Sequence, residues 1–65
     1  MFTLELSGFL NFKRVSCKNI EEARKAFSSA KNETYKAYTN GEMKDTKWTS
    51  WELLENGNLV KSGNF

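Results

Sequence analysis

The sequence predicts a small α+β domain, with one helix packed on one face of a four-stranded sheet in the order strand, strand, helix, strand, strand. Three observations predict this fold. Residues 2–6 alternate apolar and polar side chains, as expected of a strand that buries one face. Residues 19–30 place apolar side chains at helical spacing. Asn56-Gly57 separates two strand-like runs and is typical of a two-residue hairpin turn. One mixed sheet covered by the helix is the economical arrangement, and we expect a single domain over residues 1–65.

The first strand ends at Ser7-Gly8, which is a turn signal. The following run, residues 9–17, is strand-like, but the alternation of its apolar side chains is broken. Either the hairpin loop extends to about Asn11, or a bulge resets the register of the second strand. In both cases Val15 and Cys17 are expected to face inward.

The helix has a clear beginning. Asn19 can cap it by accepting a hydrogen bond from an amide one turn on, and Glu22 can reach back toward the start of the helix. The apolar stripe is narrow and rich in alanine, which favours close packing on a sheet. Its members are Ile20, Ala23, Phe27 and Ala30.

The end of the helix has two alternatives. The helix could continue from Ala30 to Tyr38, with Asn40-Gly41 as its stop. It could instead break near Asn32, leaving residues 35–39 extended. The polar residues 41–47 are interpreted as a loop in either case.

The C-terminal hairpin sets the predicted core through its register. With regular strands around the turn, Leu53 faces Val60 in the core, and Glu52 faces Lys61 on the wetter side. The predicted core therefore comprises Leu4, Leu6, Ala23, Phe27, Trp51, Leu53 and Val60.

Three segments carry a family resemblance: the opening strand over residues 2–8, residues 23–27 on the helix, and Trp48-Thr49 at the start of the third strand. With the order of elements, they make most of the chain similar to the immunoglobulin-binding β-grasp domain of the protein G type. That family binds antibodies through a helix glutamate, neighbouring polar helix residues and a third-strand tryptophan. Trp48 matches the tryptophan, whereas Arg24 stands at the glutamate position. The resemblance implies a β-grasp architecture and argues against antibody binding.

The composition excludes several classes of site. The 65 residues carry a net charge of +2, with 38% apolar and 14% aromatic residues. This mild charge is far from the basic footprint of a committed nucleic-acid binder. There is one cysteine, Cys17, and no histidine. We therefore expect no disulfide framework, no metal site and no cofactor.

Catalysis has little support in the sequence. Cys17 has no histidine base, and a buried free cysteine is the common case. Glu21 and Glu22 point apart on a helix and are typical of first-turn charges. Nucleophile-turn and phosphate-loop motifs are absent. We expect a non-enzymatic protein.

The free thiol, with no signal peptide and no membrane-spanning run, predicts a complete short chain in the cytoplasm with no membrane partner.

Binding of another protein is the leading functional interpretation. By the hairpin register, Trp48, Leu54 and Leu59 share the outer face of the sheet. An exposed apolar patch with a tryptophan is typical of a partner site. In the alternative, Trp48 turns inward and caps the core. A short chain without catalytic motifs also resembles small phage or mobile-element proteins that bind and inhibit one host protein.

The alternative function is a small nucleic-acid-binding protein. Two clusters interleave aromatic and basic side chains, which suits base stacking and phosphate contact. Their members are Phe9, Phe12, Lys13 and Arg14 in one cluster, and Lys44 and Lys47 beside Trp48 in the other.

Overall fold

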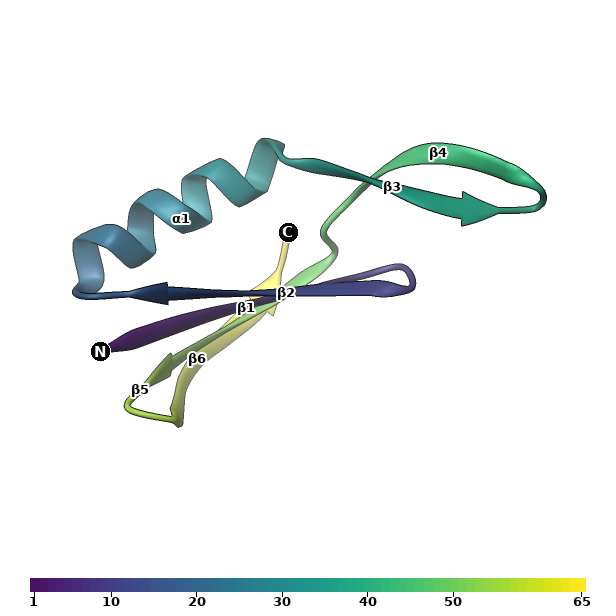
Figure 1. Cartoon of the computed structure of the whole chain (residues 1–65). Helices are drawn as coiled ribbons and strands as arrows, with labels where there is room; N and C mark the ends of the chain where they lie inside the picture. The colour runs from purple at the N-terminus through teal and green to yellow at the C-terminus, as the bar shows by residue number, and fades with distance from the viewer.

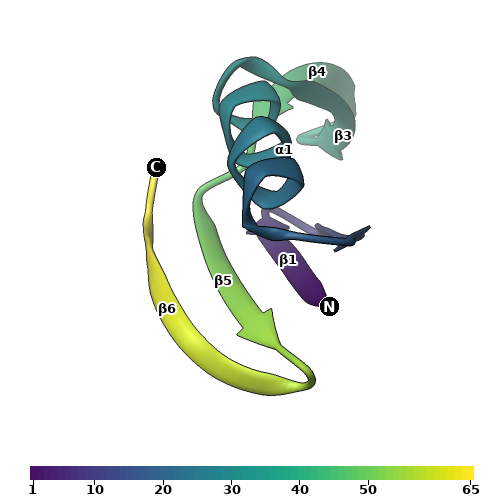
Figure 2. The ribbon, with the colours of Figure 1, turned by 90° about the vertical axis from the view of Figure 1, so that its left-hand side faces the viewer.

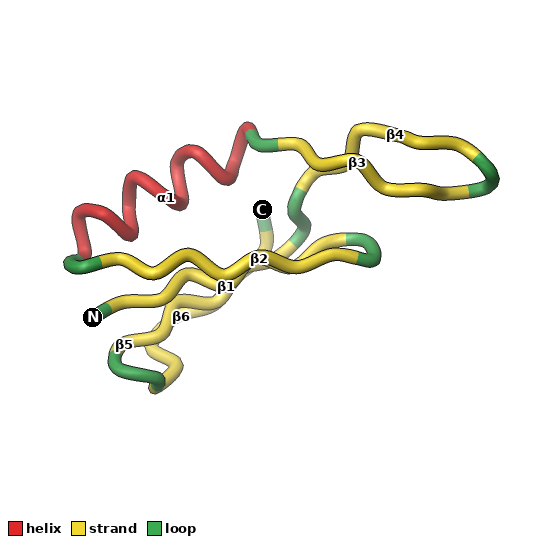
Figure 3. Tube along the Cα trace, viewed as in Figure 1, coloured by secondary structure: helices red, strands yellow, loops and turns green.

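The computed structural model describes all 65 residues, which form six strands and one helix (Figure 1). Four strands make an antiparallel sheet in the order β2-β1-β5-β6, with the helix on one face. The other two strands pair only with each other and form a hairpin arm that projects from one end of the molecule (Figure 3). The elements are β1 (Phe2–Gly8), β2 (Asn11–Cys17), α1 (Ile20–Asn32), β3 (Thr34–Thr39), β4 (Glu42–Lys47), β5 (Ser50–Glu55) and β6 (Asn58–Asn64).

The predicted single four-stranded mixed sheet, and the β-grasp architecture with it, are therefore wrong. The helix breaks at Asn32, and residues 34–39 are extended, as one of the two alternatives expected. Residues 42–47 form a strand, where we expected a loop. The reason is the turn at Asn40-Gly41, whose φ angles of 50° and 79° are both positive, as a type I′ two-residue hairpin turn requires.

The start of α1 follows the predicted capping chemistry. The amide of Glu22 donates to Asn19 Oδ1 over 2.9 Å, and the Glu22 carboxylate accepts from the amide of Lys18 over 3.0 Å. Two small side chains of the helix, Ala23 and Ala30, are buried. Alanine at these positions lets the helix approach the sheet closely, and α1 contacts β1 and β2.

The C-terminal hairpin contains a bulge that the sequence did not reveal. The turn at Asn56-Gly57 is confirmed by positive φ angles of 50° and 86°, and Leu54 pairs with Leu59, the two leucines that were expected to share the outer face. Between Leu53 and Leu54 the register shifts, so that Leu53 pairs with Lys61. The predicted pairs Leu53–Val60 and Glu52–Lys61 are therefore wrong. Val60 is the extra residue, and 52% of it is exposed, so it lies outside the core.

The core is small and centres on Trp48, which is only 5% exposed. Trp48 packs in one cluster with Leu4, Leu6 and Ala30. Of the predicted core residues, Leu4, Leu6 and Ala23 are buried, while Phe27, Trp51 and Leu53 are half-buried.

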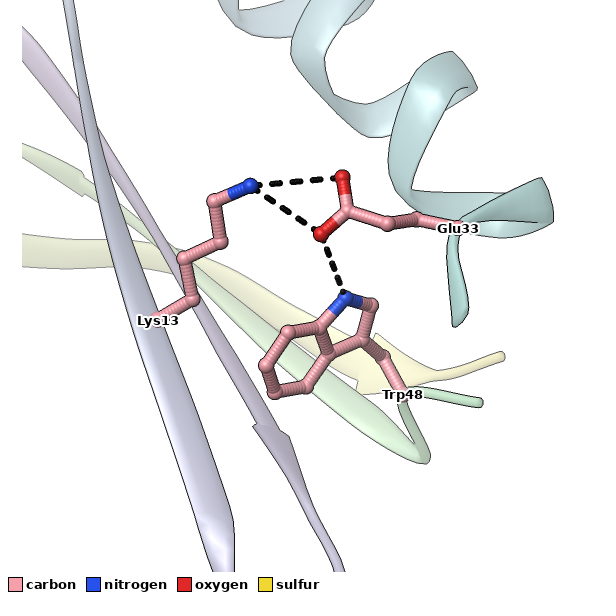
Figure 4. Close-up of polar contacts among 3 residues, drawn as sticks. All are labelled: Lys13, Glu33 and Trp48. Atoms are coloured by element: carbon pink, nitrogen blue, oxygen red, sulfur yellow. Dashed lines mark hydrogen bonds and ion pairs between the residues drawn. The ribbon is translucent and has the colours of Figure 1, made fainter. Parts of the chain in front are cut away.

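A polar cluster holds the end of the helix against this core (Figure 4). Glu33, which caps α1, accepts from Lys13 Nζ over 3.0 and 3.3 Å and from Trp48 Nε1 over 3.1 Å. Lys13 reaches the cluster because it pairs with the buried Leu6 and therefore points to the helix side of the sheet. The hydrogen bonds from Lys13 and Trp48 lower the pKa of the Glu33 carboxyl.

The hairpin arm is anchored at its base. The Tyr35 ring lies against the Trp48 ring with centroids 4.4 Å apart, and its hydroxyl donates to the Phe9 carbonyl over 3.2 Å. Gly8 lies directly under this ring, since a Cβ at Gly8 would be 2.1 Å from the hydroxyl oxygen. The backbone amide of Thr49 also donates to the β1–β2 hairpin, at the Ser7 carbonyl over 2.8 Å. The arm thus leaves the sheet in a fixed direction.

The only helix, α1, is too short and too polar to cross a bilayer.

Replacing Trp48 by alanine should leave much of the chain unfolded. Loss of a buried aromatic side chain costs about 3–5 kcal/mol. A domain of this length has a free energy of unfolding of about 3–10 kcal/mol. The exposed Leu59 is the matched control, and Leu59→Ala should change the unfolding free energy by less than about 0.5 kcal/mol. Denaturant titration followed by circular dichroism measures both. A Trp48→Ala protein that unfolds at the parent midpoint would contradict the core assignment.

Acid should weaken the fold through Glu33. The pKa of Glu33 is lower in the folded protein than in the unfolded chain, so the ionised carboxylate stabilises the fold at pH values above the unfolded-state pKa. This stabilisation is lost as the pH falls through the folded-state pKa. The loss therefore lies below about pH 4.5, the ordinary value for this carboxyl. Glu33→Gln and Lys13→Met should each reduce the acid-induced loss of unfolding free energy. An acid response in both variants equal to that of the parent would rule this contribution out.

Candidate functional site

The helix leaves half of its side of the sheet uncovered. An α-helix is about 10 Å wide, whereas neighbouring strands lie about 4.8 Å apart, so one helix cannot cover four strands. Figure 2 shows α1 over β1, with β5 and β6 extending to one side of it. A groove of about 330 Å³ lies there, which we call the open groove. Its apolar lining consists of Leu4, Ile20, Ala23, Phe27, Trp51 and Leu53.

The aromatic residues of the open groove hold one another in place. The rings of Phe27 and Trp51 meet edge to face with centroids 5.1 Å apart, and Phe65 stacks on Phe27 at 5.3 Å. Trp51 in turn lies against its cross-strand partner Gly63, where a Cβ would come within 3.0 Å of the indole. The Phe65 amide donates to the Thr49 carbonyl over 3.0 Å, which fixes the last residue of the chain. The groove is therefore preformed.

Two cations complete the lining of the open groove. Arg24 comes from α1 and Lys61 from β6, on either side of the apolar residues. The four ion pairs of the structure use other cations, so neither charge is neutralised within the chain. The arrangement suits a ligand that is apolar along its centre and negatively charged at its margins.

The predicted outer-face site does not form as expected. Trp48 lies in the core, as the alternative interpretation expected, because it precedes β5 by two residues and the strand alternation does not extend back to it. Leu54 and Leu59 do pair across the two strands; Leu54 is half-buried and Leu59 is 56% exposed. Of the three residues expected on the outer face, the two leucines therefore lie together, and the tryptophan does not lie with them.

The first aromatic–basic cluster is divided between the two faces of the sheet. Lys13 points to the helix side and is paired with Glu33. Arg14, the next residue along β2, points to the other side, where it pairs with Glu5 over 2.8 Å and lies 5.8 Å from the centre of the Phe12 ring. Phe9 is half exposed at the turn.

The second cluster is also divided. Lys44 and Lys47 lie on the arm at an odd spacing, which places them on opposite faces of β4. Lys44 is 3.8 Å from Glu42, and Trp48 beside them is buried. The structure therefore does not gather the predicted nucleic-acid-binding residues on one surface.

The sequence analysis did not identify three residues of the open groove as site residues. They are Ile20, which is part of its apolar lining, and the cations Arg24 and Lys61. Ile20 was interpreted as part of the helix stripe, Arg24 as a departure from a family pattern, and Lys61 as the partner of Glu52. The available signal was the narrowness of the helix stripe, which is too small to cover a four-stranded sheet.

Cys17 is 3% exposed and hydrogen-bonds weakly to the Val15 carbonyl, with its Sγ 3.8 Å from the oxygen. Burial, and next the negative charge of Glu22, raise the pKa of the Cys17 thiol. Both effects disfavour the reactive thiolate.

Alkylation of Cys17 by iodoacetamide at neutral pH should therefore be slow in the folded protein and fast in denaturant. The Glu22→Gln variant should react somewhat faster than the parent, because it lacks the charge that disfavours the thiolate. Mass spectrometry at successive times measures the rates. Equal rates in buffer and denaturant would show that the thiol is accessible.

No protein-family model, curated protein or solved structure is similar enough to this chain to place it in a family.

Proposed function

We propose that this chain is a small non-enzymatic module that binds another protein, and that the open groove is its binding surface. The observation that carries the proposal is the preformed aromatic surface left uncovered beside α1, with Arg24 and Lys61 at its margins. Aromatic residues and arginine are the types enriched at the energetic centres of protein interfaces. An uncovered apolar surface also costs free energy in water, which a partner would recover.

The chemistry of the chain supports a binding role over catalysis. The chain has no histidine, and its one thiol is buried with a raised pKa. A module of this kind acts by occupying a surface of its partner, which is also how a small phage or mobile-element inhibitor would act on a host protein. The free thiol supports placing it in the reducing environment of the cytoplasm.

Nucleic-acid binding is the alternative proposal, and the arm would carry it. Lys44 and Lys47 project on β4, and the ring of Tyr38 is 64% exposed on β3. Lys47 lies on the same face of the arm as the Tyr38 ring, whereas Lys44 lies on the other face. A ring and a cation on one exposed face suit base stacking and phosphate contact. The outer-face pair Leu54 and Leu59 is the alternative protein-binding surface.

Affinity capture with matched variants tests the proposal. Ile20→Glu places a charge in the open groove, and as the first residue of α1 it favours the helix dipole, so the variant should stay folded. Leu59→Glu makes the same kind of change on the outer face. We expect partners retained by the parent and by Leu59→Glu to be lost with Ile20→Glu, with a fall in affinity of about tenfold or more, or about 1.4 kcal/mol.

Other outcomes would move the site or change the partner class. A partner lost with Leu59→Glu and retained with Ile20→Glu would assign binding to the outer face. A partner lost after nuclease treatment, together with oligonucleotide binding that falls steeply with salt and with Lys44→Gln and Lys47→Gln, would favour the nucleic-acid alternative. Circular dichroism of each variant confirms that it is folded.

A further inference from the structure

We infer that the open groove accepts one amphipathic helix of a partner protein, with acidic side chains along the margins of its apolar face. The inference rests on the proposed function and names the chemistry of the partner. Three features of the groove carry it: the spacing of the residues that α1 presents, the irregular edge of β6, and the two unpaired cations.

The wall that α1 presents to the open groove has the spacing of a helix-packing surface. Its groove-lining residues are Ile20, Ala23, Arg24 and Phe27, which are positions i, i+3, i+4 and i+7. Ala23 is buried against the sheet, so Ile20, Arg24 and Phe27 form the accessible part of this wall. The four residues run along about 10 Å of the helix axis, or two turns. Ridges of this spacing pack against a second helix lying about 8–10 Å away. That distance places the second helix beside α1 and over β5, the part of the sheet that α1 leaves open.

An added strand fits the molecule less well than an added helix. The edge available next to the open groove is β6, and its register is broken by the bulge that leaves Val60 unpaired. Bulges and lysines on an edge strand are features that oppose pairing with another strand, and Lys61 follows Val60 directly. A helix needs no backbone pairing and uses only the face of the sheet, where Trp51 and Leu53 lie.

The charges of the groove favour an acidic partner. Arg24 and Lys61 have no ion pair, and covering them with an apolar surface would remove their hydration without compensation. Carboxylates at the margins of an otherwise apolar helix face would meet both cations.

A second copy of this chain does not meet these requirements. Its only helix, α1, already packs two alanines of its stripe against its own sheet, at Ala23 and Ala30. A two-fold contact through this region would also bring Arg24 and Lys61 near the same cations of the partner copy. The occupant is therefore a helix of a different protein.

Selection from a displayed library of random peptides about 18 residues, or five turns, long tests the inference. Binders are selected on the parent protein and depleted on Ile20→Glu, so that only groove-dependent peptides remain. We expect the survivors to carry apolar residues at i, i+3, i+4 and i+7 and a net negative charge. Circular dichroism of a synthetic survivor should show helix on binding.

Charge reversal gives the sharper measurement. The double variant Arg24→Glu and Lys61→Glu should bind an acidic survivor at least about tenfold more weakly, and should bind the same peptide with its acids replaced by lysine more tightly than the parent does. Leu59→Glu is the matched control and should leave both affinities unchanged.

The remaining outcomes overturn the inference. Survivors with alternating apolar and polar residues would mean that the groove takes a strand. Selected peptides without negative charge would contradict the inference that the partner helix is acidic. The absence of any groove-dependent peptide would contradict the inference that the groove accepts a helix. Self-association of the parent that Ile20→Glu abolishes would mean that the groove takes a second copy. The proposed function stands or falls separately, on the loss of captured partners with Ile20→Glu.

Discussion

The structure depends on the position of the Trp48 indole. Its ring fills the centre of a core that has only seven buried residues, and its N–H donates to Glu33 at the end of the helix. Lys13 closes the cluster from β2, and Tyr35 stacks on the ring from the arm. One side chain thus joins the helix, the main sheet and the arm. In a chain of 65 residues there is little other apolar volume to do this.

This constraint also accounts for the open groove. Glu33 ties the C-terminal end of α1 to Lys13 on β2, which is an edge strand of the main sheet. The small side chains of Ala23 and Ala30 then let the helix settle closely on β1 and β2. Drawn toward that edge, the helix cannot also cover β5 and β6. The contacts that stabilise the fold are therefore the ones that leave Trp51 and Leu53 accessible.

The sequence was informative where the signal was local. The cap at Asn19 and the turn at Asn56-Gly57 need only a few neighbouring residues, and both were predicted correctly. Asn40-Gly41 is the same dipeptide, but it was interpreted as the stop of a helix that continues to Tyr38, and the polar residues 41–47 were interpreted as a loop. β4 is exposed along almost its whole length, so its residues carry no apolar alternation to reveal a strand. The bulge at Val60 and the burial of Trp48 depend on distant contacts. The open groove was the hardest to predict, since it arises from what the helix fails to cover.

A partner helix in the open groove would complete the missing half of the layer over the sheet and neutralise Arg24 and Lys61 together. Binding and stability are then linked, because a ligand that binds only the folded state stabilises it by about 2.7 kcal/mol at a concentration of 100 times its dissociation constant. The whole unfolding free energy of such a domain is about 3–10 kcal/mol. For a chain this small, a partner bound in the open groove would therefore supply a substantial share of the stability of the folded state.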